Sequence, residues 1–192
     1  MTSKTQTSTS LINGVDREKL SETVNLIKAT PELGKFKFGI RNEWLDGGHS
    51  RSTISSFFGA GTDFEHAVKF AVDSDEPAIL LGKDQGPNAG EYLLHALAAC
   101  VTSAMVYHAA ARGIAIEEVE SSIDGDIDLR GFLGLDENVR KGYQEIRMKL
   151  RIKADVSDEQ LQEFSALGQQ YSPMLDSISN GVPVKVAAER MN

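Results

Sequence analysis

Cysteine is nearly absent from this chain, because Cys100 is the only one among its 192 residues. A single cysteine excludes an intrachain disulfide and a Cys-x-x-Cys redox pair. The four histidines and the one cysteine form no His-x-Glu or Cys-His cluster of the kind that indicates a zinc site. We therefore expect no metal, no cofactor and no covalent cross-link within the chain.

Basic residues and long apolar runs are also scarce. The chain has 20 Lys and Arg against 28 Asp and Glu, a net charge of −8, whereas nucleic-acid binding needs a clustered basic face. Its Ser- and Thr-rich first ten residues lack a secretory signal, so a cytoplasmic location is expected. Only residues 89–112 are long and apolar enough to span a bilayer, and Glu91, His95 and Arg112 interrupt them. A buried helix of a soluble protein explains this segment better than a membrane span.

The composition that remains is that of an ordinary folded protein. With 41% hydrophobic and 25% charged residues, the chain can bury a core, and its length fits one domain with an arm. Residues 1–34 form the expected arm, in which the first ten residues fray and residues 15–33 form a helix that ends near Pro31. Residues 35–192 form the main domain.

The main domain begins with three expected strands. Residues 36–44 and 51–58 alternate apolar and polar side chains, and Asp46-Gly47-Gly48 between them is a hairpin turn signal. Residues 64–72 also alternate strictly, which favours a third strand over the competing helix. A long helix over about 90–112 follows, with Gly113 just past its end. Because this helix is apolar on nearly every side, we infer cover from a sheet, a second helix and a second subunit.

The rest of the chain predicts two more strands, two helices and a last strand. The strands at 119–129 and 146–152 have acidic and basic outer faces, which would pair opposite charges across an antiparallel ladder. Ser157 and Ser172 are expected N-caps, and residues 182–187 alternate as a final strand. The order β-β-β-α-β-β-α-α-β indicates an α+β fold, with antiparallel sheets wrapped around a long buried central helix.

Cys100 lies within the long apolar helix, and this position allows two interpretations. A lone thiol on a buried helix is usually a small hydrophobic residue. It is a sheltered nucleophile only if a nearby cation lowers its pKa, since burial alone raises the pKa of a thiol. The residues of the helix do not decide between the two.

The sequence of residues 86–100, Gly-Pro-Asn-Ala-Gly-Glu-Tyr-Leu-Leu-His-Ala-Leu-Ala-Ala-Cys, resembles the OsmC/Ohr family. That family is named for osmotically inducible protein C and organic hydroperoxide resistance protein. Shorter stretches fit the same pattern: Gly113-Ile114, Val119-Glu120, Ser172-Pro173 and Val182-Pro183-Val184. The resemblance covers about residues 36–187. It implies an intertwined homodimer with two active sites at the subunit interface, and a peroxiredoxin-like antioxidant activity that reduces organic hydroperoxides under oxidative stress.

The resemblance also assigns roles to individual residues. Cys100 matches the peroxidatic cysteine, and Glu91 matches a glutamate that acts with an arginine to polarise the thiol. Arg51, just past the first hairpin turn, is our placement of that arginine, and Arg41 at the other end of the hairpin is the alternative. The second family cysteine begins a Cys-Pro-Val-like stretch, for which this chain has Ser172-Pro173-Met174. The usual two-cysteine cycle is therefore impossible within this chain.

The spacing of Glu91 and Cys100 limits how they could act together. They are nine residues apart, so on one straight helix they face opposite sides and are separated by about 13 Å. Either the helix begins after Glu91, or Glu91 serves the cysteine of a second subunit, which we favour. His95 and His108 are expected to be core or interface residues, and His49 is expected to be exposed in the hairpin turn.

Three functions fit these observations. The leading one is a one-cysteine organic hydroperoxide reductase, in which Cys100 reacts and an external thiol regenerates it. The second is a non-catalytic protein of the same fold that binds a small apolar ligand, which Ser172 in place of a resolving cysteine favours. The third is a redox sensor, in which oxidation of Cys100 alters the dimer without turnover.

Overall fold

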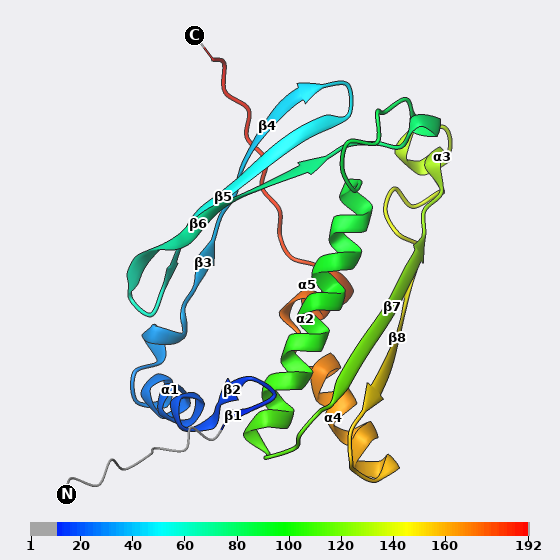
Figure 1. Ribbon diagram of the computed structural model, residues 1–192. Helices are drawn as coiled ribbons and strands as arrows, with labels where there is room; N and C mark the ends of the chain where they lie inside the picture. Colours follow the sequence, from blue (N-terminus) through cyan, green and yellow to red (C-terminus); the bar gives the residue numbers. More distant parts are fainter. Residues whose placement is uncertain (1–10, 192) are drawn as a thin grey trace, which may run out of the picture. The chain divides into compact units, whose positions relative to one another are not determined.

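The computed structural model describes residues 11–191 (Figure 1). The predicted fraying of the first ten residues lies outside this range. The chain divides into two compact units between His95 and Ala96. We call the described residues 11–95 unit 1 and residues 96–191 unit 2.

Unit 1 begins with a small hairpin and a helix. Strands β1 (Leu11–Ile12) and β2 (Val15–Asp16) pair with each other, and helix α1 follows over Arg17–Ala29. The expected helix at 15–33 is therefore shorter than the sequence pattern suggested. It starts later because the Asp16 side chain caps it, and it ends earlier because Pro31–Gly34 form a separate 3₁₀ turn, η1.

The sheet of unit 1 is built around one long strand. Strand β5 (His49–Gly59) pairs antiparallel with β3 (Lys37–Phe38), β4 (Arg41–Asp46) and β6 (Thr62–Ser74). The hairpin turn after Asp46 and the strand assignment of residues 64–72 are both confirmed. The expected strand at 36–44 is interrupted, because Gly39 and Ile40 leave the ladder between β3 and β4.

Helix α2 (Ala89–Ala111) follows the short 3₁₀ turn η2 (Ala78–Leu80), and it continues from unit 1 into unit 2. Its predicted extent is confirmed, and Gly113 after it has a φ of 79°, a left-handed conformation that favours glycine. Among residues 11–191, α2 is the one helix whose length and apolar composition would suit a membrane span. The chain itself buries one stripe of α2: Leu97, Val101, Met105, Ala109 and Ala110.

Unit 2 pairs a two-stranded sheet with helices. Strands β7 (Glu118–Asp126) and β8 (Glu145–Lys153) are antiparallel, and the short helix α3 (Leu129–Phe132) lies between them in sequence. Helix α4 (Asp158–Gln170) starts at the predicted Ser157 cap, and helix α5 (Pro173–Asn180) starts at Ser172. The predicted strand at 119–129 ends at Asp126, because the Asp128 side chain caps α3 by accepting from the Arg130 N–H.

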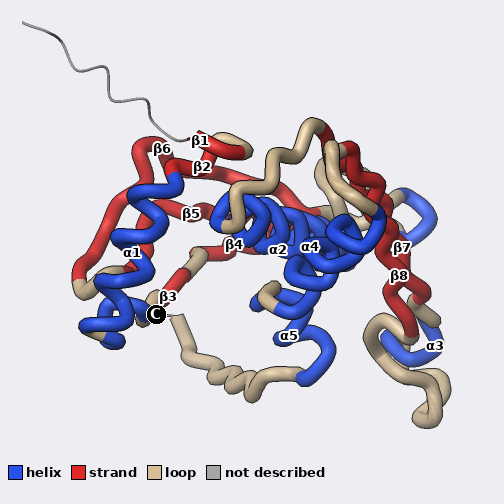
Figure 2. The backbone as a smooth tube through the Cα atoms, turned by 90° about the horizontal axis from the view of Figure 1, so that it is seen from below, coloured by secondary structure: helices blue, strands red, loops and turns tan. Residues whose placement is uncertain are grey.

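The core of unit 2 lies where α2 and α4 pack together. Met105 and Phe164 are fully buried, and Leu167 is nearly so. Figure 2 shows α4 running beside α2, and Gly168 allows their close approach: a Cβ there would lie 2.8 Å from the Met105 Cβ. Side chains of the sheet, including Val119, Leu150 and Ile152, pack against this core. The amphipathic strands and helices thus bury their apolar sides together.

The outer face of the β7–β8 ladder carries the predicted opposite charges. Glu120 lies opposite Arg151 and Asp124 opposite Arg147, and both pairs form ion pairs. This confirms the cross-strand pairing expected from the two charge patterns.

The predicted strand at 182–187 is wrong. Residues 181–191 have no regular secondary structure, and Val182, Val184 and Val186 are exposed. A strand needs the hydrogen bonds of a neighbour, and these valines have no ladder partner within the described part of the chain. The remaining elements form the expected α+β arrangement of antiparallel sheets and a long helix.

Candidate functional site

Cys100 lies on α2 within unit 2 and is half-buried. Its main-chain oxygen accepts a hydrogen bond from the Ser103 hydroxyl at 3.1 Å. Within residues 96–191, the thiol itself has no hydrogen bond or ion pair. Its helical neighbours Leu97 and Val101 line a cavity of about 430 Å³, whose other walls come from β8, α4 and α5. Cys100 itself does not line this mainly apolar cavity, and its side chain is partly open to solvent.

Ser172 caps the helix that follows it. It is only 2% exposed, and its hydroxyl accepts a hydrogen bond from the Leu175 N–H at 3.2 Å. Pro173 occupies the first turn of α5, where its missing N–H is not needed. The position at which the family resemblance places a resolving cysteine is therefore a buried N-cap in this chain.

Arg51 is held by a carboxylate that the sequence did not suggest. Its Nε donates to Asp73 Oδ1 at 2.9 Å and its Nη2 to Asp73 Oδ2 at 3.0 Å. These two bonds follow from the register, in which Arg51 of β5 lies directly opposite Asp73 of β6. The hydrogen bonds from Arg51 and then His49 hold the pKa of the Asp73 carboxyl below its ordinary value, and Asp73 raises the pKa of Arg51. The guanidinium remains half-exposed.

Asp73 has two further partners in unit 1. The His49 Nε2 lies 3.0 Å from Asp73 Oδ1, and the Tyr92 hydroxyl donates to the main-chain oxygen of Asp73 at 2.7 Å. The expectation that His49 is exposed is wrong, because its side chain is only 12% exposed beside Asp73. Arg51, Asp73, His49 and Tyr92 thus form one hydrogen-bonded group, which we call the Asp73 cluster.

Glu91 completes the start of α2. The Glu91 N–H donates to Asn88 Oδ1 at 2.9 Å, and the Asn88 N–H donates to Glu91 Oε2 at 2.8 Å. This reciprocal pair satisfies two N–H groups that a helix start leaves without partners. Because α2 begins at Ala89, the alternative in which the helix starts after Glu91 is excluded. Glu91 and Cys100 therefore lie on opposite sides of one continuous helix.

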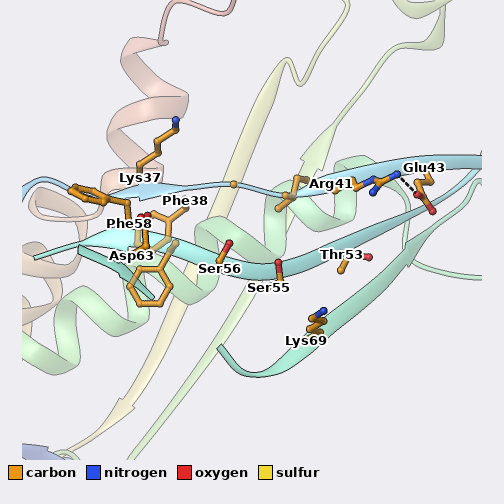
Figure 3. Close-up of a pocket in the computed structure, with 13 residues that line it drawn as sticks. Lys37, Phe38, Arg41, Glu43, Thr53, Ser55, Ser56, Phe58, Asp63 and Lys69 are labelled. Carbon is orange, nitrogen blue, oxygen red and sulfur yellow. Dashed lines mark ion pairs between the residues drawn. The ribbon is translucent and has the colours of Figure 1, made fainter. Parts of the chain in front are cut away.

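Arg41, the alternative arginine, lies in a different environment. It pairs with Glu43 at 3.0 Å and its side chain is 81% exposed. Both residues line a cavity of about 580 Å³ in unit 1. Its walls include the chain between β3 and β4 and Ser55 and Ser56 of β5 (Figure 3). Arg51 does not line this cavity. Of the two arginines, Arg51 is the one whose guanidinium is fixed by two hydrogen bonds to a single carboxylate.

The other histidines lie away from the Asp73 cluster in sequence. His108 stacks on Tyr171 with ring centroids 4.3 Å apart, and burial together with the nearby Arg112 charge lowers its pKa. His95 is exposed in the described chain. Among residues 11–191, no group of three His, Cys, Asp or Glu side chains is placed to hold a metal ion.

The sequence analysis missed Asp73, His49 and Tyr92 as members of the cluster. Tyr92 follows Glu91 within the motif and could have been considered from its place there. Asp73 had no comparable signal, because its partner is set by an irregular register. The ladder pairs Ser56 with Glu65 but Ile54 with Phe70, so a bulge shifts β6 against β5. Without that bulge, Phe70 rather than Asp73 would lie opposite Arg51.

Comparison with known proteins agrees with this fold. The sequence profile of the OsmC-like protein family matches residues 82–187, more than half of the chain. An OsmC-like protein from Mycoplasma pneumoniae has a similar structure, with a TM-score of 0.58, 17% identity, and coverage of 74% of this chain and 87% of the other. An organic hydroperoxide resistance protein OsmC from Legionella pneumophila gives a TM-score of 0.52 and 17% identity, covering 77% of this chain and 94% of the other. Comparison with curated proteins gave no significant match. By its sequence profile and its fold, the chain belongs to the OsmC-like protein family.

Proposed function

We propose that this protein reduces organic hydroperoxides, with Cys100 as the reacting thiol and an external thiol as reductant. The observation that carries the proposal is the half-buried, partly accessible Cys100 in a chain of the OsmC-like family, whose helical neighbours Leu97 and Val101 line a mainly apolar cavity. The similar Legionella protein is named for organic hydroperoxide resistance. An apolar cavity suits the organic part of such a substrate, while the thiol supplies the chemistry.

The first step is a nucleophilic displacement at oxygen. The Cys100 thiolate attacks one oxygen of the hydroperoxide, the O–O bond breaks, and the other oxygen leaves as an alkoxide that takes up a proton to become an alcohol. The sulfur is oxidised to sulfenic acid and the peroxide is reduced. A guanidinium supports such a step by favouring the thiolate and by donating hydrogen bonds to the departing oxygen. We assign this role to Arg51.

The second step needs a thiol from outside the chain, because Cys100 is the only cysteine. A reductant thiol attacks the sulfenic acid, releasing water and forming a mixed disulfide. A second reductant thiol then attacks that disulfide and releases Cys100. Ser172 cannot replace a resolving cysteine, since its oxygen forms no disulfide.

We also propose that the active protein is a homodimer. Among residues 11–191, one stripe of α2 is buried, and several large apolar side chains of unit 1 are more than half exposed: Phe38, Ile40, Trp44 and Val68. A second copy would cover such surfaces. In this arrangement Glu91 and Arg51 of one copy act with Cys100 of the other, which removes the conflict posed by the opposite faces of Glu91 and Cys100.

A second candidate function is the binding of a small apolar ligand without turnover. The observation that favours it is Ser172, whose buried hydroxyl serves α5 and leaves the chain without a resolving thiol. The cavity beside Leu97 and Val101 would then be the ligand site. A third candidate, a redox sensor, shares the first chemical step with the enzyme but not the second.

The experiment that tests these functions is a brief exposure to cumene hydroperoxide in the presence of dimedone, followed by mass spectrometry. We expect rapid, selective trapping of a sulfenic acid at Cys100 and sustained peroxide consumption when a dithiol is supplied. Both signals should disappear in Cys100→Ser and persist in the matched control Ser103→Ala. An unreactive thiol would exclude the enzyme and the sensor, and trapping without turnover would identify the sensor. A monomer by light scattering would contradict the proposed dimer.

A further inference from the structure

Asp73 accepts hydrogen bonds at every one of its acceptor oxygens. Its Oδ1 accepts from Arg51 and interacts with His49, its Oδ2 accepts from Arg51, and its main-chain oxygen accepts from Tyr92. These partners come from one strand, β5, and from the first turn of α2. A carboxylate with this many partners has one orientation, and so does the guanidinium that it holds.

The two hydrogen bonds to Asp73 leave part of the Arg51 guanidinium available for other hydrogen bonds. A guanidinium carries five N–H donors, and Asp73 takes one from Nε and one from Nη2. Three N–H donors remain, on a side chain that is 51% exposed. On the other side of β5, the residue opposite Arg51 is Glu43, and its carboxylate is paired with Arg41.

The surroundings of Asp73 are themselves fixed. Gly86 packs directly on the main chain of Asp73, since a Cβ at position 86 would lie 2.4 Å from the Asp73 oxygen. Two residues after Asp73, the buried Asp75 carboxylate accepts from the N–H groups of Glu76, Lys83 and Gln85. The segment from Asp73 to Gly86 is therefore tied both to its own loop and, through Tyr92, to the start of α2.

We propose that Asp73 is the positioning residue for Arg51, and that His49 and Tyr92 hold Asp73 in place for this purpose. Glu91 does not fill this role within its own chain, because its carboxylate caps α2. The inference rests on the proposed function, in which Arg51 donates to the peroxide oxygens. The three remaining N–H donors of Arg51 are then already oriented before substrate binds. Little reorganisation is therefore needed when charge develops on the leaving oxygen.

The orientation of Arg51 can be tested independently of any activity, by NMR of the arginine Nε–H groups in the whole protein. We expect a slowly exchanging Nε–H signal, assigned to Arg51 by its loss in Arg51→Lys. Asp73→Asn should make its exchange with solvent at least tenfold faster, and Asp73→Glu should restore part of the protection. The matched control Glu65→Gln, an acid-to-amide change on the same strand, should leave the signal unchanged. An unaffected signal in Asp73→Asn would overturn the proposal.

The consequence for reactivity is tested by the rate of Cys100 oxidation by cumene hydroperoxide. We expect Asp73→Asn to slow this step by about tenfold or more, as misplacement of a catalytic group does. Asp73→Glu should recover part of the rate, and Glu65→Gln should match the unsubstituted protein. Tyr92→Phe, which keeps the carboxylate, should give a smaller loss and replaces Asp73→Asn if that variant does not fold.

The two measurements separate the possible failures. Loss of the protected Arg51 signal with an unchanged oxidation rate would overturn the positioning role while leaving the proposed function intact. If the unsubstituted protein does not react with hydroperoxide, the proposed function fails, and the NMR comparison still decides whether Asp73 orients Arg51.

Discussion

The two units of this chain are stabilised by different kinds of interaction. In the described residues, every buried apolar side chain belongs to unit 2: Leu97, Val101, Met105, Ala109, Ala110, Phe164 and Leu167. The buried residues of unit 1 are Gly59 and Asp75. Unit 2 thus has an apolar core, whereas unit 1 is held by its strand ladder and by polar groups around Asp73 and Asp75. The unit with the weaker core is the one that carries the Asp73 cluster.

This difference indicates which unit would gain more from the proposed second copy. A sheet that buries little apolar surface gains little from the hydrophobic effect, and a sheet of three or more strands needs a covered hydrophobic face for independent stability. Unit 1 has aromatic contacts along one face, such as Phe57 on Phe64 at 5.2 Å, but Phe38 remains 72% exposed. In the proposed dimer, the second copy would supply the cover that the chain itself does not give.

The largest expected effect comes from comparing one phenylalanine in each unit. Phe164→Ala removes a fully buried ring of unit 2, and we expect it to lower the free energy of unfolding by about 3–5 kcal/mol. Phe38→Ala in unit 1 should cost much less when measured on dilute, monomeric chain, because that ring is exposed. Chemical denaturation at several protein concentrations checks both. Equal losses in the monomer would show that unit 1 has a core comparable to that of unit 2.

A smaller effect is expected from overfilling the α2–α4 contact. Gly168→Val would push side-chain atoms against Met105 and the Val101 carbonyl, since even a Cβ lies within 2.9 Å of them. We expect a loss of about 1–3 kcal/mol. Gly142→Ala is the matched control, because a Cβ at Gly142 meets nothing within 4 Å. Thermal unfolding of both variants measures the difference, and a neutral Gly168→Val would refute the tight contact.

The smallest expected effect is a different pH dependence of the two units. The pKa of His108 in unit 2 is lowered by burial and by Arg112, so the folded chain favours the neutral ring. That contribution to stability is complete above the unfolded pKa of about 6.5 and is lost as pH falls through the lowered folded value. Melting temperatures between pH 8 and pH 5, measured at intervals, should show this loss in the unsubstituted protein and not in His108→Gln.

In unit 1, a loss of folding stability from the buried Asp75 is expected at more acid pH. Burial raises the pKa of Asp75, but three backbone N–H donors outweigh it, so the pKa lies below its ordinary value. Stability from Asp75 is therefore present above about pH 4 and lost as pH falls below it. Asp75→Asn should lower the melting temperature near neutral pH, where the carboxylate contributes fully, and flatten the acid limb so that the two proteins converge at low pH. A melting-temperature difference that does not shrink as pH falls below about 4 would contradict this assignment.

The local pattern of the chain predicted most elements, because alternation and capping act over a few residues. The hairpin turn after Asp46, the strand at 64–72 and the caps at Ser157 and Ser172 are examples. The pattern at 182–187 failed because alternation describes only the side chains of a strand. It does not supply the neighbour whose hydrogen bonds a strand needs.

The candidate site was predicted less completely than the fold. Glu91 lies in the first turn of α2, and its observed contact is a reciprocal hydrogen-bonded pair with Asn88 that the sequence analysis did not predict. Arg51 could be named from the resemblance, but its partner could not. The bulge between Ile54 and Ser56 decides which residue faces Arg51, and it depends on how two strands fit together. The chemical roles of Cys100, Arg51 and Glu91 remain predictions.

The buried hydroxyl of Ser172 has a consequence for engineering. Installing a thiol there, by Ser172→Cys, would give the chain a second sulfur but take away the oxygen that receives the Leu175 amide. Sulfur is a weak acceptor, so the first turn of α5 would loosen as redox capacity was added. At this position, adding a thiol for disulfide chemistry would weaken the N-terminal cap of α5.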